Sequence, residues 1–294
     1  MFQFFANIFG YLLNFINNFV GNYGFAIILF TVLIKIIMLP LSIKQQRTMK
    51  KSTELNEKIK VLQFKYKNDP EKLNREMMDL YKKENMSPFS GCLSTIAQFI
   101  LLISIFYMVR CPLTYMEKIN NDQINTYVQQ LKDGGITVNQ AYSEIDIIRE
   151  LDYLKEKMPE DEGLNKINLN MNFCGLDLSK IPQQNLNDWT VYIIPALYII
   201  STFISMKITT SMQKKSKKND GVIDITEKEE KDSKEEKNEM EDMMEQSNKM
   251  MSWMMPIMSV SISLVAPLGL ALYWLVNNIL MIGERLVLNK IIKD

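Results

Sequence analysis

The residue whose type and position point most directly to a function is Lys35. It lies inside an apolar stretch, Gly24 to Ile43, that is long enough to cross a bilayer, since a span needs about 20 mainly apolar residues. At about 1.5 Å of rise per residue, Lys35 lies roughly 13 Å before Lys44, where the basic residues that follow the span begin. A charge at that depth costs several kcal/mol unless it is paired or hydrated, so Lys35 is a candidate functional residue. The alternative is a lysine whose side chain reaches the membrane surface past a tilted helix.

Polar residues in the other apolar stretches could join Lys35 in one site. The residues that we expect to line a shared hydrophilic groove inside the bilayer are Thr31, Lys35, Ser94, Gln98, Tyr273, Trp274, Asn277 and Asn278. The only full charge of this groove would be positive, so it would attract an acidic or polar segment and lower the desolvation cost of moving that segment through hydrocarbon. The alternative is that the Ser, Thr and Asn side chains only hold neighbouring helices together.

Several kinds of chemistry are excluded by composition. The chain has no histidine, so it can hold neither a histidine-based metal site nor a His-dependent catalytic triad. Its three cysteines, Cys92, Cys111 and Cys174, lack the paired spacing of a zinc site, although Cys111 and Cys174 could form a disulfide. The apolar stretches contain no nucleophile with a base, no paired carboxylates and no phosphate-binding glycine loop. We therefore expect no enzyme activity, no cofactor, no metal and no direct nucleic-acid specificity.

The distribution of charge along the 294 residues predicts the fold class. The chain has 34 basic and 34 acidic residues, but almost all of them lie between nearly uncharged runs. This pattern predicts an all-α polytopic membrane protein with five transmembrane helices around a hydrophilic groove. The expected segments are an interfacial amphipathic helix (1–24), five spans (25–43, 89–110, 189–209, 251–266 and 267–285), a cytosolic helical hairpin (44–88), an extracytoplasmic loop (111–188), a charged cytosolic loop (210–250) and a cytosolic tail (286–294).

The positive-inside rule predicts the orientation. Residues 1–24 contain no charged side chain, whereas basic residues follow the first span, so the N-terminus is expected outside and the C-terminus in the cytoplasm. The loop 111–188 has thirteen acidic and seven basic residues, which fits the outside. Polar and apolar residues alternate at helical spacing in residues 1–24. This pattern favours a retained interfacial helix over a cleaved signal peptide, which would have a basic first region.

The expected cytosolic hairpin has two amphipathic arms separated by Asp69 and Pro70, which have the residue types of a helix start. Its basic residues outnumber its acidic ones. The hairpin is therefore either a solvated charged surface or a docking arm for an anionic partner or lipid head groups. The residues that we expect to take part in such recruitment are Lys58, Lys65, Lys72 and Arg75.

Four sequence segments together resemble the YidC/Oxa/Alb family of membrane protein insertases. They are FTVLIKIIMLPLSIKQQ, MSPFSGCLSTIAQFILLISIFY, NFCGLDLS and APLGLALYWLVNNILMIGERL. The resemblance implies five helices enclosing a groove that is closed to the outside, in a bacterial plasma membrane. It also implies that the chain inserts nascent membrane proteins, alone or beside the Sec translocon. The hairpin would help recruit the substrate, the ribosome or the signal recognition pathway.

The family's functional positions fall on particular residues of this chain. Its intramembrane basic residue falls on Lys35, its polar second-span residue on Gln98, and its last-span aromatic on Trp274. Many members have arginine where this chain has Lys35, and a buried lysine can lose its proton whereas arginine cannot. Ser94 stands where the family often has proline. The loop 111–188 is longer than expected from family members with a single membrane and does not match the large sandwich domain of members with two membranes, and the sequence assigns no function to it.

Two other function classes stay open at this point. A small-molecule transporter or channel would be expected to contain inverted repeats and discontinuous spans, and the sequence has no internal repeat. A structural assembly scaffold would be expected to tolerate Lys35→Ala.

Overall fold

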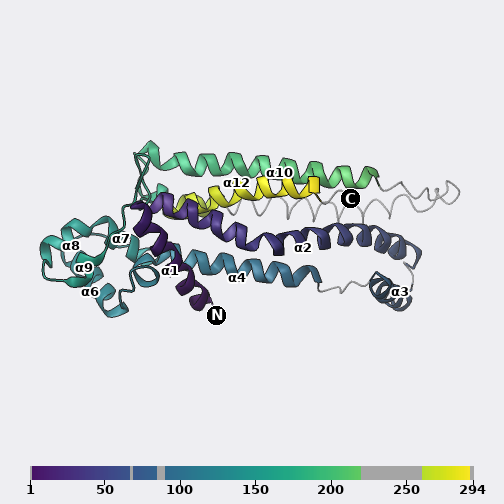
Figure 1. The fold of residues 1–294 in the computed structure, drawn as a ribbon, viewed down its shortest axis with the longest axis horizontal. Coiled ribbons are helices and arrows are strands. Elements are labelled where there is room, and N and C mark those ends of the chain that lie inside the picture. The colour runs from purple at the N-terminus through teal and green to yellow at the C-terminus, as the bar shows by residue number, and fades with distance from the viewer. Residues whose placement is uncertain (1, 67–68, 85–89, 220–259, 292–294) are drawn as a thin grey trace.

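The computed structural model describes residues 2–66, 69–84, 90–219 and 260–291, and most of them are helical (Figure 1). The longer helices are α1 (Phe2–Val20), α2 (Tyr23–Lys65), α3 (Pro70–Lys83), α4 (Ser90–Arg110), α10 (Ile193–Asn219) and α12 (Leu268–Ile291). The short elements are α5 (Pro112–Tyr115), α6 (Asn121–Asp133), α7 (Ser143–Arg149), α8 (Leu151–Lys157), α9 (Glu162–Lys166), β1 (Asn172–Phe173), β2 (Leu176–Asp177), η1 (Pro182–Gln184) and η2 (Trp189–Tyr192). The short strands β1 and β2 pair as an antiparallel hairpin. The fold is therefore mostly helical, as expected.

The long helices α2, α4, α10 and α12 lie alongside one another (Figure 1). Helix α12 packs against both α10 and α2, and α2 also packs against α4. The segment of residues 111–188, which we call the cap segment, lies at one end of these helices, and α3 lies at the other end. Two helices that the sequence separates by more than two hundred residues, α2 and α12, are therefore neighbours.

Three described helices are long and apolar enough to cross a membrane: Tyr23–Thr48, Trp189–Ser211 and Leu268–Ile291. They fall on the first, third and last predicted spans. On the second predicted span the described part contains a shorter apolar helix, Phe99–Arg110. Of the predicted fourth span, residues 260–265 are helical, and residues 251–259 lie outside the described residues, as does most of the predicted loop 210–250.

Helix α2 does not end where the first predicted span ends. The helix is 43 residues long in total and continues past Pro40. Its C-terminal part therefore forms the first arm of the predicted hairpin. The buried side chains of Leu55 and Ile59 continue an apolar stripe at helical spacing, and this part of α2 packs against α3. The predicted start of the second arm is confirmed, because the Asp69 side chain caps α3 by accepting a hydrogen bond from Lys72 N at 3.0 Å, with Pro70 in the first turn.

Helix α1 packs against α4, α2 and α5 through a stripe of mostly small residues. The buried members are Ala6, Gly10, Leu13 and Asn17. Polar side chains of α1 bond the cap segment, because Asn14 Nδ2 donates to Met116 O at 3.0 Å and Asn17 Nδ2 donates to Asn168 O at 3.0 Å. Phe15 and Phe19 are exposed. The amphipathic pattern of the sequence therefore corresponds to a helix that is held by the cap segment and presents aromatic side chains outward.

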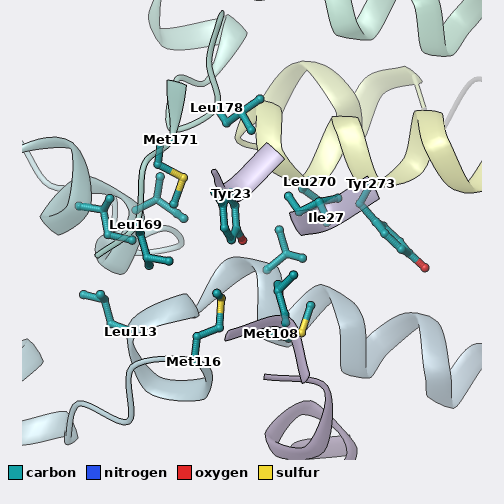
Figure 2. Close-up of a cluster of buried hydrophobic side chains, with 14 of the residues drawn as sticks. Tyr23, Ile27, Met108, Leu113, Met116, Leu169, Met171, Leu178, Leu270 and Tyr273 are labelled. Atoms are coloured by element: carbon teal, nitrogen blue, oxygen red, sulfur yellow. The ribbon is translucent and has the colours of Figure 1, made fainter. Parts of the chain in front are cut away.

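The cap segment shares the hydrophobic core of the long helices. Figure 2 shows side chains from α2, α4, α12 and the cap segment meeting in one cluster. Its labelled members are Tyr23, Ile27, Met108, Leu113, Met116, Leu169, Met171, Leu178, Leu270 and Tyr273. Helices α7 and α8 of the cap segment meet at Glu150. The described cysteines Cys111 and Cys174 are both free thiols.

Candidate functional site

Lys35 forms an ion pair with a carboxylate that the sequence analysis did not select. Its Nζ lies 3.3 Å from Oε2 of Glu284, which is on α12. The two side chains are 20% and 13% exposed, so both charges are largely removed from solvent. Lys35 is 12 residues from the start of α2, which places it about 18 Å along this helix. The pair thus links two of the helices that are long enough to span a membrane.

A buried ion pair of this kind contributes little to stability compared with well-packed apolar side chains. The loss of hydration of two charges offsets most of their attraction, whereas removal of one partner alone leaves an unpaired buried charge and is strongly destabilising. Ionisable residues inside apolar helices are therefore candidates for function. The counter-ion Glu284 explains how the charge of Lys35 is tolerated inside the helix. The side chain therefore does not need to reach the membrane surface.

Two other predicted groove residues, Thr31 and Tyr273, are buried near the α2–α12 contact. Thr31 is 2% exposed, and its Oγ1 donates a hydrogen bond of 2.6 Å to Ile27 O within α2. Tyr273 is 6% exposed, and Figure 2 places it beside Ile27 and Leu270. Both side chains therefore contribute to packing in this structure.

Two residues of α12 face α10. The ring of Trp274 lies 6.2 Å from the ring of Tyr198, measured between centroids. Asn278 is 6% exposed, and its Nδ2 donates to Ser201 Oγ at 2.9 Å and to Thr202 Oγ1 at 3.1 Å. These hydrogen bonds satisfy a buried amide and hold α12 against α10.

The remaining predicted residues of the site are Asn277, Ser94 and Gln98. Asn277 is partly buried on α12 and lies seven residues before Glu284, on the same face of the helix. The side chains of Ser94 and Gln98, on α4, lie outside the described residues. Asn277 thus lies on the side of α12 that faces Lys35 and α2, whereas Trp274 and Asn278 lie on the side that faces α10.

Arg285 is a second charge that the sequence analysis did not place in the site. Its guanidinium donates a hydrogen bond to Thr209 Oγ1 on α10. Glu284 and Arg285 are adjacent in sequence but engage different helices, because successive side chains of a helix point about 100° apart. The signal that could have revealed Glu284 is that it is the only acidic residue in the α12 sequence.

Main-chain hydrogen bonds join the cap segment to the starts of α2 and α12. We call residues 169–180 the strap. Tyr23 N at the start of α2 donates to Asn170 O at 3.1 Å, and Leu268 N and Gly269 N at the start of α12 donate to Lys180 O and Leu178 O at 2.9 Å each. The first N–H groups of a helix have no partner within it, so the strap satisfies both helix starts.

Side chains strengthen the contact between the strap and α2. Asn22 Nδ2 donates to Asn172 O at 2.7 Å. The ring of Phe25 packs edge-to-face on Phe173 with the centroids 5.1 Å apart. Gly24 lies so close to the Phe173 side chain that an added Cβ would overlap it. The strap includes NFCGLDLS, one of the four segments that carry the family resemblance.

The cap segment also contains a buried carboxyl, Glu144. It is 5% exposed and accepts hydrogen bonds from Thr114 N at 3.0 Å and from Thr114 Oγ1 at 2.6 Å. Burial raises the pKa of Glu144 above its usual value of 4.5. Burial, reinforced by the neighbouring Glu144 carboxyl, raises the pKa of the Cys111 thiol to about 12. The Cys111 thiol therefore stays protonated and unreactive near neutral pH.

The predicted recruitment residues lie on the α2–α3 hairpin. Lys58 pairs with Glu84 on the surface. The Nζ atoms of Lys65 and Lys72 lie 5.3 and 5.2 Å from the centroid of the Tyr66 ring, as cation–π contacts. Arg75 is exposed on α3. The hairpin thus carries an exposed basic surface.

In the described part of the chain, no three Cys, Asp or Glu side chains gather as a metal site.

Comparison with known proteins identifies the family. The chain matches the family model described as 60Kd inner membrane protein over residues 15–294. A membrane protein insertase YidC of Caldanaerobacter subterraneus subsp. tengcongensis is 48% identical over 101 residues, which cover 34% of this chain and 49% of that protein. A membrane protein insertase YidC of Francisella tularensis subsp. novicida is 45% identical over 109 residues, 37% of this chain and 20% of that protein. The alignments thus span half or less of each relative. Because the family model covers nearly the whole chain, the chain belongs to the 60Kd inner membrane protein family.

Proposed function

We propose that this chain is a membrane protein insertase and chaperone, which inserts and helps fold nascent integral membrane proteins, alone or with the Sec translocon. Membership of the 60Kd inner membrane protein family supports this proposal, as do relatives named membrane protein insertase YidC. The single observation that carries the proposal is the charged pair of Lys35 and Glu284, which joins two helices that are long and apolar enough to cross a membrane. The chain would lie in the bacterial plasma membrane with its N-terminus outside and its C-terminus in the cytoplasm.

The proposed mechanism is electrostatic and involves no covalent step and no cofactor. A short translocated tail with acidic residues is attracted to Lys35, where the low dielectric strengthens the attraction. We propose that the groove that receives it includes Asn277, which lies on the face of α12 that also carries Glu284. Asn278 keeps α12 attached to α10 while the tail passes.

The apolar helix attached to the tail needs a path into lipid. Leu197, Ile200 and Ile204 are exposed on α10, and Ile279 is exposed on α12. Because α10 and α12 pack together, we propose that these side chains belong to one apolar surface. A nascent helix that slides along this surface exchanges its contacts with the insertase for contacts with lipid.

The α2–α3 hairpin is proposed to recruit partners on the cytoplasmic side. Lys65, Lys72 and Arg75 are exposed and basic, so they are suited to anionic surfaces. We propose the ribosome and components of the signal recognition pathway as these partners. Lys58 contributes less, because its charge is paired with Glu84.

Depletion of the chain in its host tests the proposal. A short-tailed model substrate is expected to remain inside the cell, where an externally added protease cannot cleave its tail. Photo-crosslinking from positions 277 and 274 to a stalled nascent membrane protein is expected to exceed crosslinking from Leu186, an exposed residue of the cap segment that serves as the control. Normal insertion after depletion, or equal crosslinking at all three positions, would contradict the proposal.

A further inference from the structure

The ion pair between Lys35 and Glu284 raises a question about the proposed function. Lys35 attracts an acidic tail only if its positive charge is available, yet Glu284 Oε2 lies 3.3 Å from its Nζ. A paired charge presents little field to its surroundings, because the opposite charge cancels it at short range. The structure therefore holds the site in a self-neutralised state.

Packing alone does not account for the presence of Glu284. The contact between α2 and α12 already includes buried apolar side chains, such as Ile27 and Leu270. A buried ion pair is no more stabilising than apolar residues of similar size. Glu284 is also the only acidic residue of α12, so it is not part of a general acidic surface.

We propose that Glu284 is an internal counter-ion that occupies Lys35 until a carboxylate of the substrate tail replaces it, and that this competition limits how strongly the site prefers acidic tails. The inference rests on the proposed function. The exchange conserves charge pairing, because Lys35 gives up one carboxylate and gains another. A tail without acidic residues cannot release Glu284 and meets a site with its pair intact.

The geometry leaves the released Glu284 side chain a direction in which to move. Glu284 lies seven residues before Ile291, so it is about 10 Å from the C-terminal end of α12. Its side chain is already 13% exposed, and position 284 is one residue from the end of the predicted last span, 267–285. Arg285 does not compete for the substrate in the same place, since its guanidinium is bonded to Thr209 on α10.

Substitution of Glu284 separates this role from that of Lys35. Glu284→Gln keeps the size and hydrogen-bonding capacity of the side chain but leaves Lys35 with an uncancelled charge. The double variant Lys35→Gln with Glu284→Gln removes both charges and serves as the matched control. Glu284→Asp keeps the charge on a shorter side chain, so it tests the proposal should the glutamine variant fail to fold.

The experiment uses the full chain in lipid vesicles with a photo-crosslinker at Ile279. It captures stalled nascent chains whose short tails carry either two aspartates or two asparagines. The measured quantity is the ratio of crosslinks to the acidic tail over crosslinks to the neutral tail. We expect Glu284→Gln to raise this ratio by about fivefold, which corresponds to roughly 1 kcal/mol, Glu284→Asp to raise it less, and the double variant to bring it close to one.

Three results would overturn the inference. In the first, the folded Glu284→Gln variant has the ratio of the wild type or a lower one. In the second, the double variant keeps the acidic preference. If the wild type prefers acidic tails in the first case, the proposed function stands and only the role of Glu284 fails. In the second case the preference does not come from Lys35, so the proposed capture by Lys35 fails as well. In the third, the wild type captures neither tail, and the proposed function fails together with the inference.

Discussion

The close contact at Gly10 leads to a prediction about how α1 is held. A Cβ at this position would overlap the carbonyl oxygen of Tyr115 and lie 2.6 Å from its carbonyl carbon, whereas ordinary contact begins at 3.4 Å. Gly10→Ala therefore requires α1 and α5 to separate by about 0.8 Å or more. The obstacle is backbone, so a change of rotamer cannot relieve it. Overpacking of this kind costs about 1–3 kcal/mol, and the gain in helix propensity from glycine to alanine offsets roughly 0.5–1 kcal/mol of it.

We expect a net loss of about 1–2 kcal/mol for Gly10→Ala, or roughly 2–8 °C in Tm. Gly283→Ala is the matched control, because Gly283 is also helical and its added Cβ would meet nothing within 4 Å. This control should be neutral or slightly stabilising. The assay is thermal unfolding of the two variants and the wild type in one detergent. A Gly10→Ala protein that melts with the wild type or with Gly283→Ala would refute the close packing of α1 on α5.

Three further predictions concern the site and the cap segment. For Lys35, we expect Lys35→Arg to preserve insertion of short-tailed substrates and Lys35→Ala to impair acidic tails most. Lys35→Glu should impair them further, because it also places a second carboxylate against Glu284; equal insertion by all three variants would remove Lys35 from the function. For Asn278, a double-mutant cycle with Ser201→Ala should give a coupling of about 0.6–1.7 kcal/mol in unfolding measurements, and a coupling of zero would contradict the interhelical hydrogen bond. For Glu144, the raised pKa means that the folded state binds a proton more tightly than the unfolded state, so the stability of the cap segment should fall as pH rises from about 4.5. Glu144→Gln should flatten the dependence of Tm on pH over that range, and an unchanged slope would contradict the burial of this carboxyl.

The parts of the fold that follow from local sequence were predictable. Long apolar runs predicted spans at 25–43, 189–209 and 267–285, and the structure has long apolar helices there, at Tyr23–Thr48, Trp189–Ser211 and Leu268–Ile291. Asp69 and Pro70 predicted the start of α3, because capping depends on residues that are close in sequence. The end of α2 was harder to predict, since charged residues mark where a helix leaves the hydrocarbon but do not terminate it.

The contacts between distant segments could not be predicted from one sequence. The pairing of Lys35 with Glu284 depends on how α12 is rotated about its axis, and a rotation of one residue would turn a different side chain toward α2. The strap bonds α2 and α12 through main-chain atoms, which have no residue signature. The role of Asn17 was missed for a related reason. A polar side chain on an amphipathic helix predicts contact with water, but this one bonds a carbonyl of the cap segment.

The strap gives the pair α2 and α12 the geometry of a hinge. Both helices are fixed at their N-terminal ends by main-chain hydrogen bonds, so substitution of side chains does not easily loosen this joint. Any opening between them must therefore increase with distance from the strap. At about 18 Å from the joint, a rotation of roughly 5° separates the helices by about 1.5 Å, which is enough to break the contact between Lys35 and Glu284. Small rotations at the strap would therefore separate the Lys35 and Glu284 charges and leave each of them without its partner.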